Sequence, residues 1–327
     1  MELVISTFGT SLGRDNEGFV ITHKDGRQRI PASSVHSIQL SKGAVVSTDA
    51  VMLAVENEID LFFIDKGGDP VARIWSPRYG SVSTIRKGQL AFSSSSEAVL
   101  WIKEIITEKI DNQQAVLLMF DEESDSSVTM SVNKAVARLE VYRNKVQSLE
   151  AICVSDVAST LRGWEGVASK IYFDCLNLFL PDYLRFSQRT QHPAMDVANA
   201  MFNYGYGIMY GKIEGMLIKA GIDPYIGVLH RDEYNRPVLV YDVIEKYRVW
   251  IDYIVLSLLR QDIISEEYYS VREDGSVWLE TLGRRVLIQA VNDYLDEVTD
   301  AGDLSRSRIV QIKLYCQKLA QNFKKYN

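Results

Sequence analysis

Three carboxylates and one histidine of this 327-residue chain could together bind a divalent metal ion. Asp242 and Glu245 lie three positions apart, His230 precedes them in a separate segment, and Glu165 lies far upstream. Carboxylates and an imidazole drawn from separate elements can hold a divalent cation and leave positions for water. This donor set suits Mn²⁺ or Mg²⁺ better than structural zinc, which prefers Cys and His, and the imidazole modestly favours Mn²⁺.

The same residues also have simpler interpretations. In a helix, side chains three apart share a face with Cβ atoms about 5–6 Å apart, so Asp242 and Glu245 repel each other unless a cation lies between them. Lys246, four residues after Asp242, and Arg248, three after Glu245, offer such partners without a metal. A single histidine is more often a structural residue. Taken alone, the pattern leaves a metal site and an ordinary acidic helix face both open.

Hydrophobic spacing predicts the helices that carry these residues. Apolar positions spaced three and four apart predict a long helix in which Glu165 flanks the apolar stripe. The stripe consists of Val157, Leu161, Trp164, Ala168, Ile171, Cys175 and Leu178. A second stripe predicts a helix that ends at Gly221. This stripe consists of Val197, Met201, Tyr204, Ile208, Gly211, Gly215 and Ile218. Pro237 suits the first turn of a third helix, over Asp242, Glu245 and Arg248.

The first ninety residues have the pattern of short strands. The Asp25-Gly26 pair between two β-prone runs predicts a hairpin, and Asp49 is expected to cap a short helix. The predicted strands are Phe19–Thr22, Arg29–Pro31, Val35–Leu40, Asp60–Ile64 and Val71–Trp75, and the predicted helix covers Val51–Val55. The Gly67–Pro70 segment fits a hairpin connection.

The pattern changes from strands to helices at Ser93–Ser96, which is either a flexible linker or a helix N-cap. Both interpretations place a boundary here. The sequence therefore predicts an α+β protein, with a small β-rich domain over residues 1–92 and a larger all-α, metal-binding catalytic domain over residues 93–327.

Composition places the chain among globular proteins with a core, since 46% of its residues are hydrophobic and 24% are charged. No apolar run is long enough for a membrane span, and the first residues lack the features of a secretory signal. Three separated cysteines predict buried, reduced thiols. These features favour a cytoplasmic protein with no membrane partner. The net charge of −7 argues only weakly against nucleic-acid binding, which needs local basic patches.

Several short motifs resemble those of the CRISPR-associated protein one family, in order and spacing, over nearly the whole chain. They are Lys103…Lys109…Asn112-Gln113, the Gly-x-Glu-Gly-x-Ala-x-x-x-Tyr-Phe of residues 163–173, the Phe-x-x-Arg-x-x-His-Pro-x-x-Asp-x-x-Asn of residues 186–199, Asn203–Tyr206, Ala220–Pro224 with Gly227 and His230, and Leu239–Glu245 with Arg248.

The resemblance assigns roles to individual residues. It implies that Glu165, His230 and Glu245 bind the metal, Mg²⁺ or Mn²⁺, and that Asp242 is the adjacent catalytic acid. Whether Asp242 orients a ligand, binds a second ion or pairs with Lys246 on the surface stays open. The positions that line or support the DNA site are Tyr172, Lys170, Arg189, Asn199 and Arg248.

This chain departs from the family pattern at Val167, Ser169-Lys170 and Val249, where Asn, Ala-Arg and Pro are usual. None of these changes removes a ligand. Lys170 keeps the charge of the usual Arg but lacks the fork that binds phosphate with two hydrogen bonds.

The resemblance implies a metal-dependent endonuclease and integrase that acts in antiviral defence. Family members insert short DNA fragments into a CRISPR array by attack of a 3′-hydroxyl on a phosphodiester of the repeat DNA. Their β-rich domains form homodimers, and two dimers flank a dimer of CRISPR-associated protein two; some relatives are fused to a reverse transcriptase. Two alternatives stay open: a nuclease for branched DNA, and a non-catalytic DNA-clamping scaffold. Tyr204, Tyr206 and Tyr210 either face DNA or pack in the core.

Overall fold

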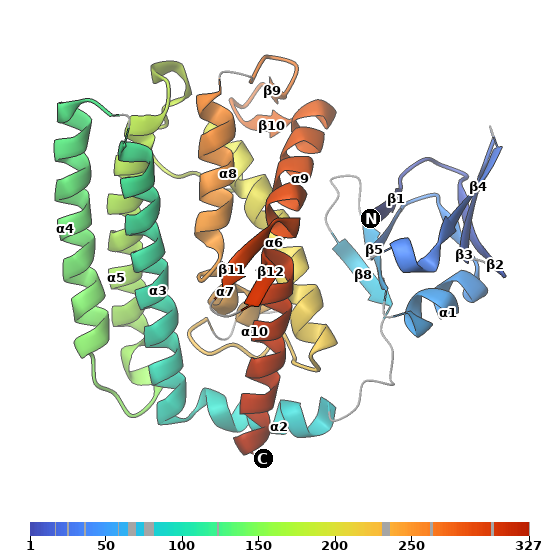
Figure 1. Cartoon of the computed structure of the whole chain (residues 1–327), viewed down its shortest axis with the longest axis horizontal. Helices are drawn as coiled ribbons and strands as arrows, with labels where there is room; N and C mark the ends of the chain where they lie inside the picture. The colour runs from blue at the N-terminus through green and yellow to red at the C-terminus, as the bar shows by residue number, and fades with distance from the viewer. Residues whose placement is uncertain are drawn as a thin grey trace. The chain divides into compact units, whose positions relative to one another are not determined.

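The chain forms two compact units, Met1–Gly80 and Ser81–Asn327 (Figure 1). The computed structural model describes residues 1–16, 18–24, 26–35, 37–57, 59–64, 70–74, 82–122, 124–230, 236–261, 264–301 and 304–326. Within these ranges no helix is long and apolar enough to cross a membrane.

The first unit contains two four-stranded sheets and a helix. One sheet has the order β1 (Glu2–Ile5), β5 (Ser37–Ser41), β7 (Asp60–Ile64) and β8 (Pro70–Ile74). Its first three strands are parallel, and β8 is antiparallel to β7. The other sheet has the order β4 (Gly26–Pro31), β3 (Gly18–His23), β2 (Ser11–Asp15) and β6 (Val45–Val46). Both sheets and helix α1 (Thr48–Glu56) bury side chains in one core, among them Leu3, Leu12, Phe19, Ile38, Leu53 and Leu61.

Most of the predicted strands are present. The β3–β4 hairpin is confirmed by antiparallel pairing from Gly18 with Pro31 to His23 with Gly26. Strands β5, β7 and β8 match the other predictions within a few residues; Asp25, Gly67–Asp69 and Trp75 lie outside the described residues. The predicted cap was wrong, because Ser47, and not Asp49, accepts the Ala50 N–H of α1 at 3.1 Å.

The second unit is helical but not all-α as predicted. Its helices are α2 (Val82–Ser93), α3 (Ser96–Asp121), α4 (Ser126–Ser148), α5 (Val154–Leu176), α6 (Val197–Lys219), α7 (Val238–Ile244), α8 (Arg248–Arg260), α9 (Thr281–Asp296) and α10 (Arg308–Phe323). Two antiparallel hairpins interrupt them, formed by β9 (Tyr269–Val271) with β10 (Val277–Leu279) and by β11 (Val298–Ala301) with β12 (Leu304–Ser307).

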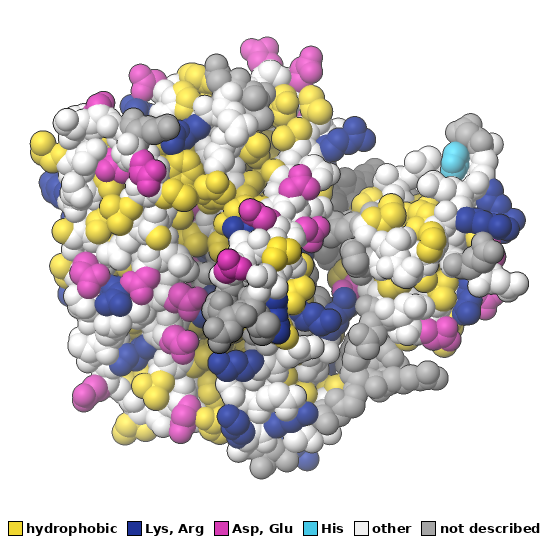
Figure 2. All heavy atoms as spheres, viewed as in Figure 1, with side chains coloured by type: hydrophobic (Ala, Val, Ile, Leu, Met, Phe, Trp, Pro, Cys, Tyr) yellow, Lys and Arg dark blue, Asp and Glu magenta, His cyan; other side chains and the backbone are white. Residues whose placement is uncertain are grey.

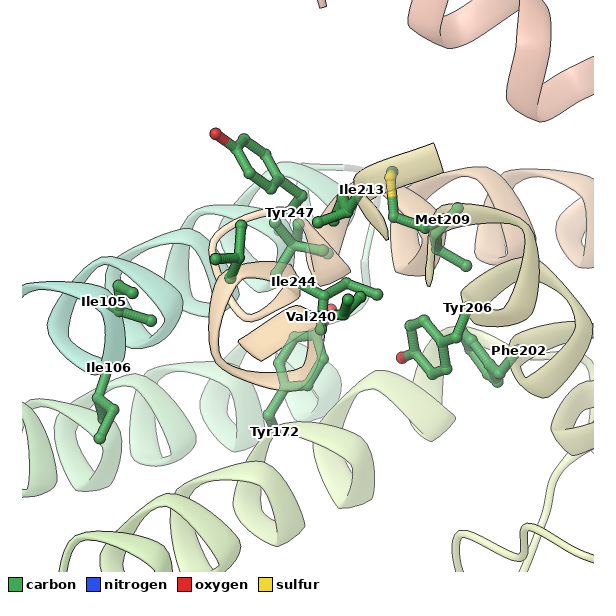
Figure 3. Packing of buried hydrophobic residues seen from close by; sticks show 14 of the residues in the cluster. Ile105, Ile106, Tyr172, Phe202, Tyr206, Met209, Ile213, Val240, Ile244 and Tyr247 are labelled. Atoms are coloured by element: carbon green, nitrogen blue, oxygen red, sulfur yellow. The ribbon is translucent and has the colours of Figure 1, made fainter. Parts of the chain in front are cut away.

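Helix α6 lies at the centre of the helical unit, where it packs against α7, α8, α9 and α10. Its buried surface is therefore broader than the single predicted stripe and includes Phe202, Tyr206 and Met209 (Figure 3). Gly205 permits the close approach of α8, because a Cβ there would lie 2.6 Å from Ile251 Cγ2. Gly221 follows the helix with a φ of 84°, as expected of its terminating residue.

Helix α2 packs with the helical unit, so the two units divide between Gly80 and Ser81, earlier than the predicted boundary after residue 92. The Gln89 side chain donates to the carbonyls of Asp223 and Ile226 at 2.7 and 2.9 Å and accepts the Asp223 N–H. Ser95 is the N-cap of α3, accepting the Ala98 N–H at 3.3 Å. The serine run is thus a helix cap between α2 and α3.

The predicted α5 stripe is confirmed from Val157 to Cys175, whose members are buried or half-buried within the helix, whereas Leu178 lies in the 3-10 turn Asn177–Phe179 that follows it. The three cysteines are free thiols, and Cys175 and Cys316 are buried as expected. Burial raises the pKa of Cys175 to about 11 and that of Cys316 to about 12.

The contact between α2 and the C-terminal residues gives a stability prediction. A Cβ at Gly88 would lie 1.9 Å from the backbone oxygen of Phe323, so Gly88→Ala should lower the free energy of unfolding by about 2 kcal/mol. Gly207→Ala on α6 is the matched control, because no atom lies within 4 Å of its added methyl; it should raise that free energy by about 0.5–1 kcal/mol. Urea denaturation of the full chain measures both. Equal stabilities would contradict the packing of α2 on the helical unit.

Candidate active site

A buried lysine lies between two of the predicted metal ligands. Lys109, on α3, donates a short hydrogen bond to Oε1 of Glu165 on α5. Its Nζ also lies 2.5 Å from Oε2 of Glu245. One buried ammonium therefore forms ion pairs with two carboxylates.

The charges of this cluster perturb one another. Burial alone would lower the pKa of Lys109, but Glu165 and Glu245 outweigh it and raise that pKa. Burial would likewise raise the pKa of Glu245, but Lys109 and Arg248 lower it to about 2. Lys109 and Glu245 are thus held in their charged forms at neutral pH. Ser169 donates a further hydrogen bond to Glu165 Oε1 at 3.0 Å, so the residue that replaces the usual Ala supports a proposed ligand.

The helix predicted over Asp242, Glu245 and Arg248 is interrupted. Helix α7 ends at Ile244, and Glu245 is its C-cap residue with helical dihedral angles (φ −56°, ψ −28°), while Arg248 begins α8. The Glu245 carboxylate contacts Lys109 and Arg248. The predicted pairing with Arg248 is confirmed, since Arg248 Nη1 lies 2.9 Å from Glu245 Oε1.

Asp242 faces the interior and holds the loop that carries His230. Its Oδ2 accepts the backbone N–H groups of Val228 and Leu229 at 2.7 and 3.1 Å, and its Oδ1 accepts the His230 N–H at 3.0 Å. Lys246 pairs with Glu108 instead. The interpretation of Asp242 as a surface carboxylate paired with Lys246 is therefore wrong.

The His230 imidazole is oriented by the same carboxylate. Its Nδ1 lies 2.7 Å from Asp242 Oδ1. Burial lowers the pKa of His230, but the hydrogen bond to Asp242 and the charges of Asp242, Glu245 and Glu165 more than compensate, so that the pKa is raised. With Nδ1–H donated to Asp242, the neutral ring presents Nε2 as a free electron pair, as metal-binding histidines commonly do.

The proposed ligands are not assembled around a metal position. Across the described part of the chain, no three His, Cys, Asp or Glu side chains are grouped closely enough to hold a metal ion. The Lys109 ammonium lies against both Glu165 and Glu245. The donor set nevertheless fits a hard divalent cation, because two carboxylates converge on one positive charge and such cations prefer oxygen ligands.

A second layer of contacts supports the cluster from α6 and α8. The Arg248 guanidinium lies 4.3 Å from the ring centroid of Tyr206, and the Tyr206 hydroxyl donates to Asp252. Burial raises the pKa of Asp252 to about 6, although Tyr206 and Arg248 oppose the shift. Figure 3 shows Tyr206 pointing inward from α6, toward Tyr172 on α5. Tyr206 is therefore a core residue and does not face DNA.

The other predicted support residues divide into two groups. Arg189 and Asn199 form an interior network: the Arg189 guanidinium donates to Asn199 and Asn203 and lies 4.8 Å from the Phe202 ring centroid. Tyr172 is fully buried, and burial followed by the charge of Asp252 raises its pKa well above the usual value. Lys170, in contrast, is exposed and pairs with Asp174 at 3.2 Å.

Comparison with known proteins decides the family. The family model for CRISPR associated protein Cas1 matches residues 3–293. The chain belongs to the Cas1 family. A relative from Archaeoglobus fulgidus, named CRISPR-associated endonuclease Cas1 1, is 31% identical over 91% of this chain and 89% of its own length. One of the same name from Francisella tularensis subsp. novicida is 29% identical over 83% of this chain and 82% of its own.

Solved structures share the fold. A Cas1 protein from Thermotoga maritima has a TM-score of 0.78 at 20% identity, covering 98% of this chain and 96% of that one. A casposase bound to integration product has a TM-score of 0.66 at 17% identity, covering 100% and 96%. A chain of a Cas6-RT-Cas1–Cas2 complex has a TM-score of 0.79 at 20% identity. The match covers 99% of this chain and 35% of the chain in that complex.

Sequence reasoning named Lys109 only as part of a Cas1-like motif and did not place it at the site. Lys109 falls within the apolar spacing of α3, among Ile102, Ile106 and Ile110. A charged residue in the buried stripe of a helix needs a counter-charge. The lysine at an apolar position of α3 could therefore have indicated a buried carboxylate nearby. Asp252, which is buried in α8, carries the same kind of signal and was also missed.

If Asp242 holds the loop before His230, its replacement should destabilise the protein even when no metal is present. Asp242→Asn replaces one acceptor oxygen by a donor facing backbone N–H groups, and should lower the free energy of unfolding by about 1–3 kcal/mol. Asp174→Asn, at an exposed ion pair on α5, should change it by less than about 0.5 kcal/mol. Urea denaturation without added metal measures both. Unchanged stability of Asp242→Asn would contradict the role of Asp242 in holding the loop.

Proposed function

We propose that this chain is a Cas1 integrase subunit, which uses Mg²⁺ or Mn²⁺ to join a 3′-hydroxyl DNA end to a phosphodiester of CRISPR repeat DNA. The observation that carries the proposal is the convergence of Glu165 and Glu245 on one positive charge, with His230 fixed beside Asp242. Family membership supports it, as do relatives named endonucleases and the shared fold of a casposase bound to integration product.

Each residue has a defined task in this proposal. Glu165 and Glu245 supply oxygen ligands, and His230 supplies Nε2, which Asp242 orients through Nδ1. Arg248 restrains Glu245 and is itself held against Tyr206. These side chains would hold a divalent ion, which would supply charge stabilisation at the phosphoryl group and help to orient the 3′-oxygen.

The reaction exchanges one phosphodiester for another. The 3′-oxygen forms a bond to phosphorus and loses its proton, while the bond from phosphorus to the 3′-oxygen of the repeat strand breaks and that oxygen takes up a proton. No oxidant or external energy source is needed. With water in place of the 3′-hydroxyl, the same site cleaves DNA, which would agree with the name endonuclease carried by the relatives.

A local basic surface provides a place for the DNA backbone despite the net charge of −7. Figure 2 shows Lys and Arg side chains gathered over the part of the helical unit where α2 and the end of α10 lie. The exposed lysines here are Lys87 on α2, Lys313 and Lys318 on α10, and Lys325 in the 3-10 turn Lys324–Tyr326. Such contacts bind phosphate without reading sequence.

The proposal extends to partners and domains. The β-rich unit serves as the dimerisation domain and the helical unit as the catalytic domain. Two dimers assemble with a dimer of CRISPR-associated protein two, in the prokaryotic cytoplasm, and a reverse transcriptase is a further candidate partner. The matched fold within a Cas6-RT-Cas1–Cas2 complex supports these assemblies.

Removal of a proposed ligand should abolish joining by the folded protein. Glu165→Gln and His230→Ala should each lower the rate of metal-dependent joining by roughly a hundredfold or more. Glu140→Gln is the matched control, because Glu140 is an exposed residue of α4 that pairs with Arg143; it should join at the normal rate. The measurement is gel-resolved joining of a labelled 3′-hydroxyl DNA end to CRISPR repeat DNA, with CRISPR-associated protein two present.

The same assay distinguishes the competing functions. Insertion specific to the repeat supports the integrase, whereas metal-dependent cutting of branched DNA without insertion supports a structure-specific nuclease. A non-catalytic scaffold would bind DNA and show neither reaction. Full joining activity in both Glu165→Gln and His230→Ala would contradict the assignment of this site.

A further inference from the structure

The position of Lys109 poses a problem of charge balance. Its ammonium is buried and lies against Glu165 and Glu245, while Arg248 holds the other oxygen of Glu245. These two cations and two carboxylates balance. The cluster is therefore neutral before any divalent ion arrives, and the oxygen atoms that would bind the ion already have a cation beside them.

A divalent ion at Glu165 and Glu245 upsets this balance. It competes with the ammonium for the same oxygens, and it adds two positive charges to a site where solvent screening is weak. The Lys109 side chain is only 4% exposed, so its ammonium has little access to water. Repulsion between the two cations is relieved if the ammonium swings to a new anion close by. A phosphate of DNA at the site is such an anion.

We propose that Lys109 makes the binding of the divalent cation and the binding of a DNA phosphate depend on each other. The cation takes over Glu165 and Glu245, and the released ammonium pairs with the phosphate. Without DNA the ammonium competes with the cation and weakens its binding. Lys109 is thus a positioning residue that favours formation of the metal site when DNA is present. This inference rests on the function proposed above for the same site.

The test measures Mn²⁺ affinity of the full chain by calorimetry, with and without a short DNA duplex ending in a 3′-hydroxyl. In the unaltered protein, DNA should tighten Mn²⁺ binding by about tenfold or more, within the usual range of coupling between two sites. Lys109→Met removes the competitor, so Mn²⁺ should bind about tenfold more tightly without DNA than it does to the unaltered protein. The further gain from DNA should shrink to about threefold or less.

Two variants serve as controls. Lys103→Met is matched to Lys109→Met, because Lys103 lies on the same helix but donates to the Leu149 carbonyl at 2.5 Å, away from the carboxylates; it should show the coupling of the unaltered protein. Lys109→Arg should keep the positive charge and the fold. The lysine side-chain ¹⁵N signal that is absent from its NMR spectrum, but present in that of the unaltered protein, belongs to Lys109. That resonance should move when Mg²⁺ and DNA are added together.

Each outcome decides a separate question. Equal Mn²⁺ affinities and equal DNA effects in the unaltered protein and Lys109→Met would overturn the role of Lys109 and leave the proposed function standing. If Lys109→Met does not fold, a Lys109 resonance that stays fixed with Mg²⁺ and DNA together would overturn it in the same way. If Mn²⁺ binds equally to the unaltered protein and to Glu165→Gln, the proposed metal site itself would be wrong.

Discussion

The ion pairs of Lys109 with Glu165 and Glu245 are the interaction on which the candidate site depends. Two carboxylates from separate helices can lie this close in a buried place only because a positive charge lies between them. Lys109 lies on α3, Glu165 on α5 and Glu245 at the end of α7, so the same interaction joins these three helices. Burying these charges unpaired would cost several kcal/mol each. The helical unit is therefore constructed around a neutral cluster.

The rest of the site is arranged to hold each charged group in one orientation. Asp242 uses both oxygens to fix the loop before His230 and the imidazole itself. Arg248 restrains Glu245 from the start of α8, and Tyr206 supports Arg248 from the central helix. A bound ion would thus find ligands whose positions are already set by packing, which reduces the ordering that binding must impose.

The sequence predicted the helices more completely than the contacts between them. The α5 stripe was predictable because Val157, Leu161 and Ile171 repeat with the helical period. The end of α7 at Ile244 was not predictable, since an uninterrupted helix fits Val240–Arg248 equally well by local pattern. Strand β1 was missed because its partner β5 is distant in the chain, and pairing of this kind leaves no local signal. Membership of the Cas1 family was recognisable from the motifs around Glu165 and His230, which family comparison confirms.

The central claim is that Lys109 occupies the charge position that a divalent ion takes when DNA is bound. The most direct measurement is an anomalous difference map from crystals grown with Mn²⁺ and a DNA duplex ending in a 3′-hydroxyl. The account predicts a manganese peak bound by Glu165, Glu245 and His230 Nε2, with the Lys109 ammonium moved onto a DNA phosphate. A manganese peak elsewhere, with Lys109 still paired to both carboxylates, would contradict it.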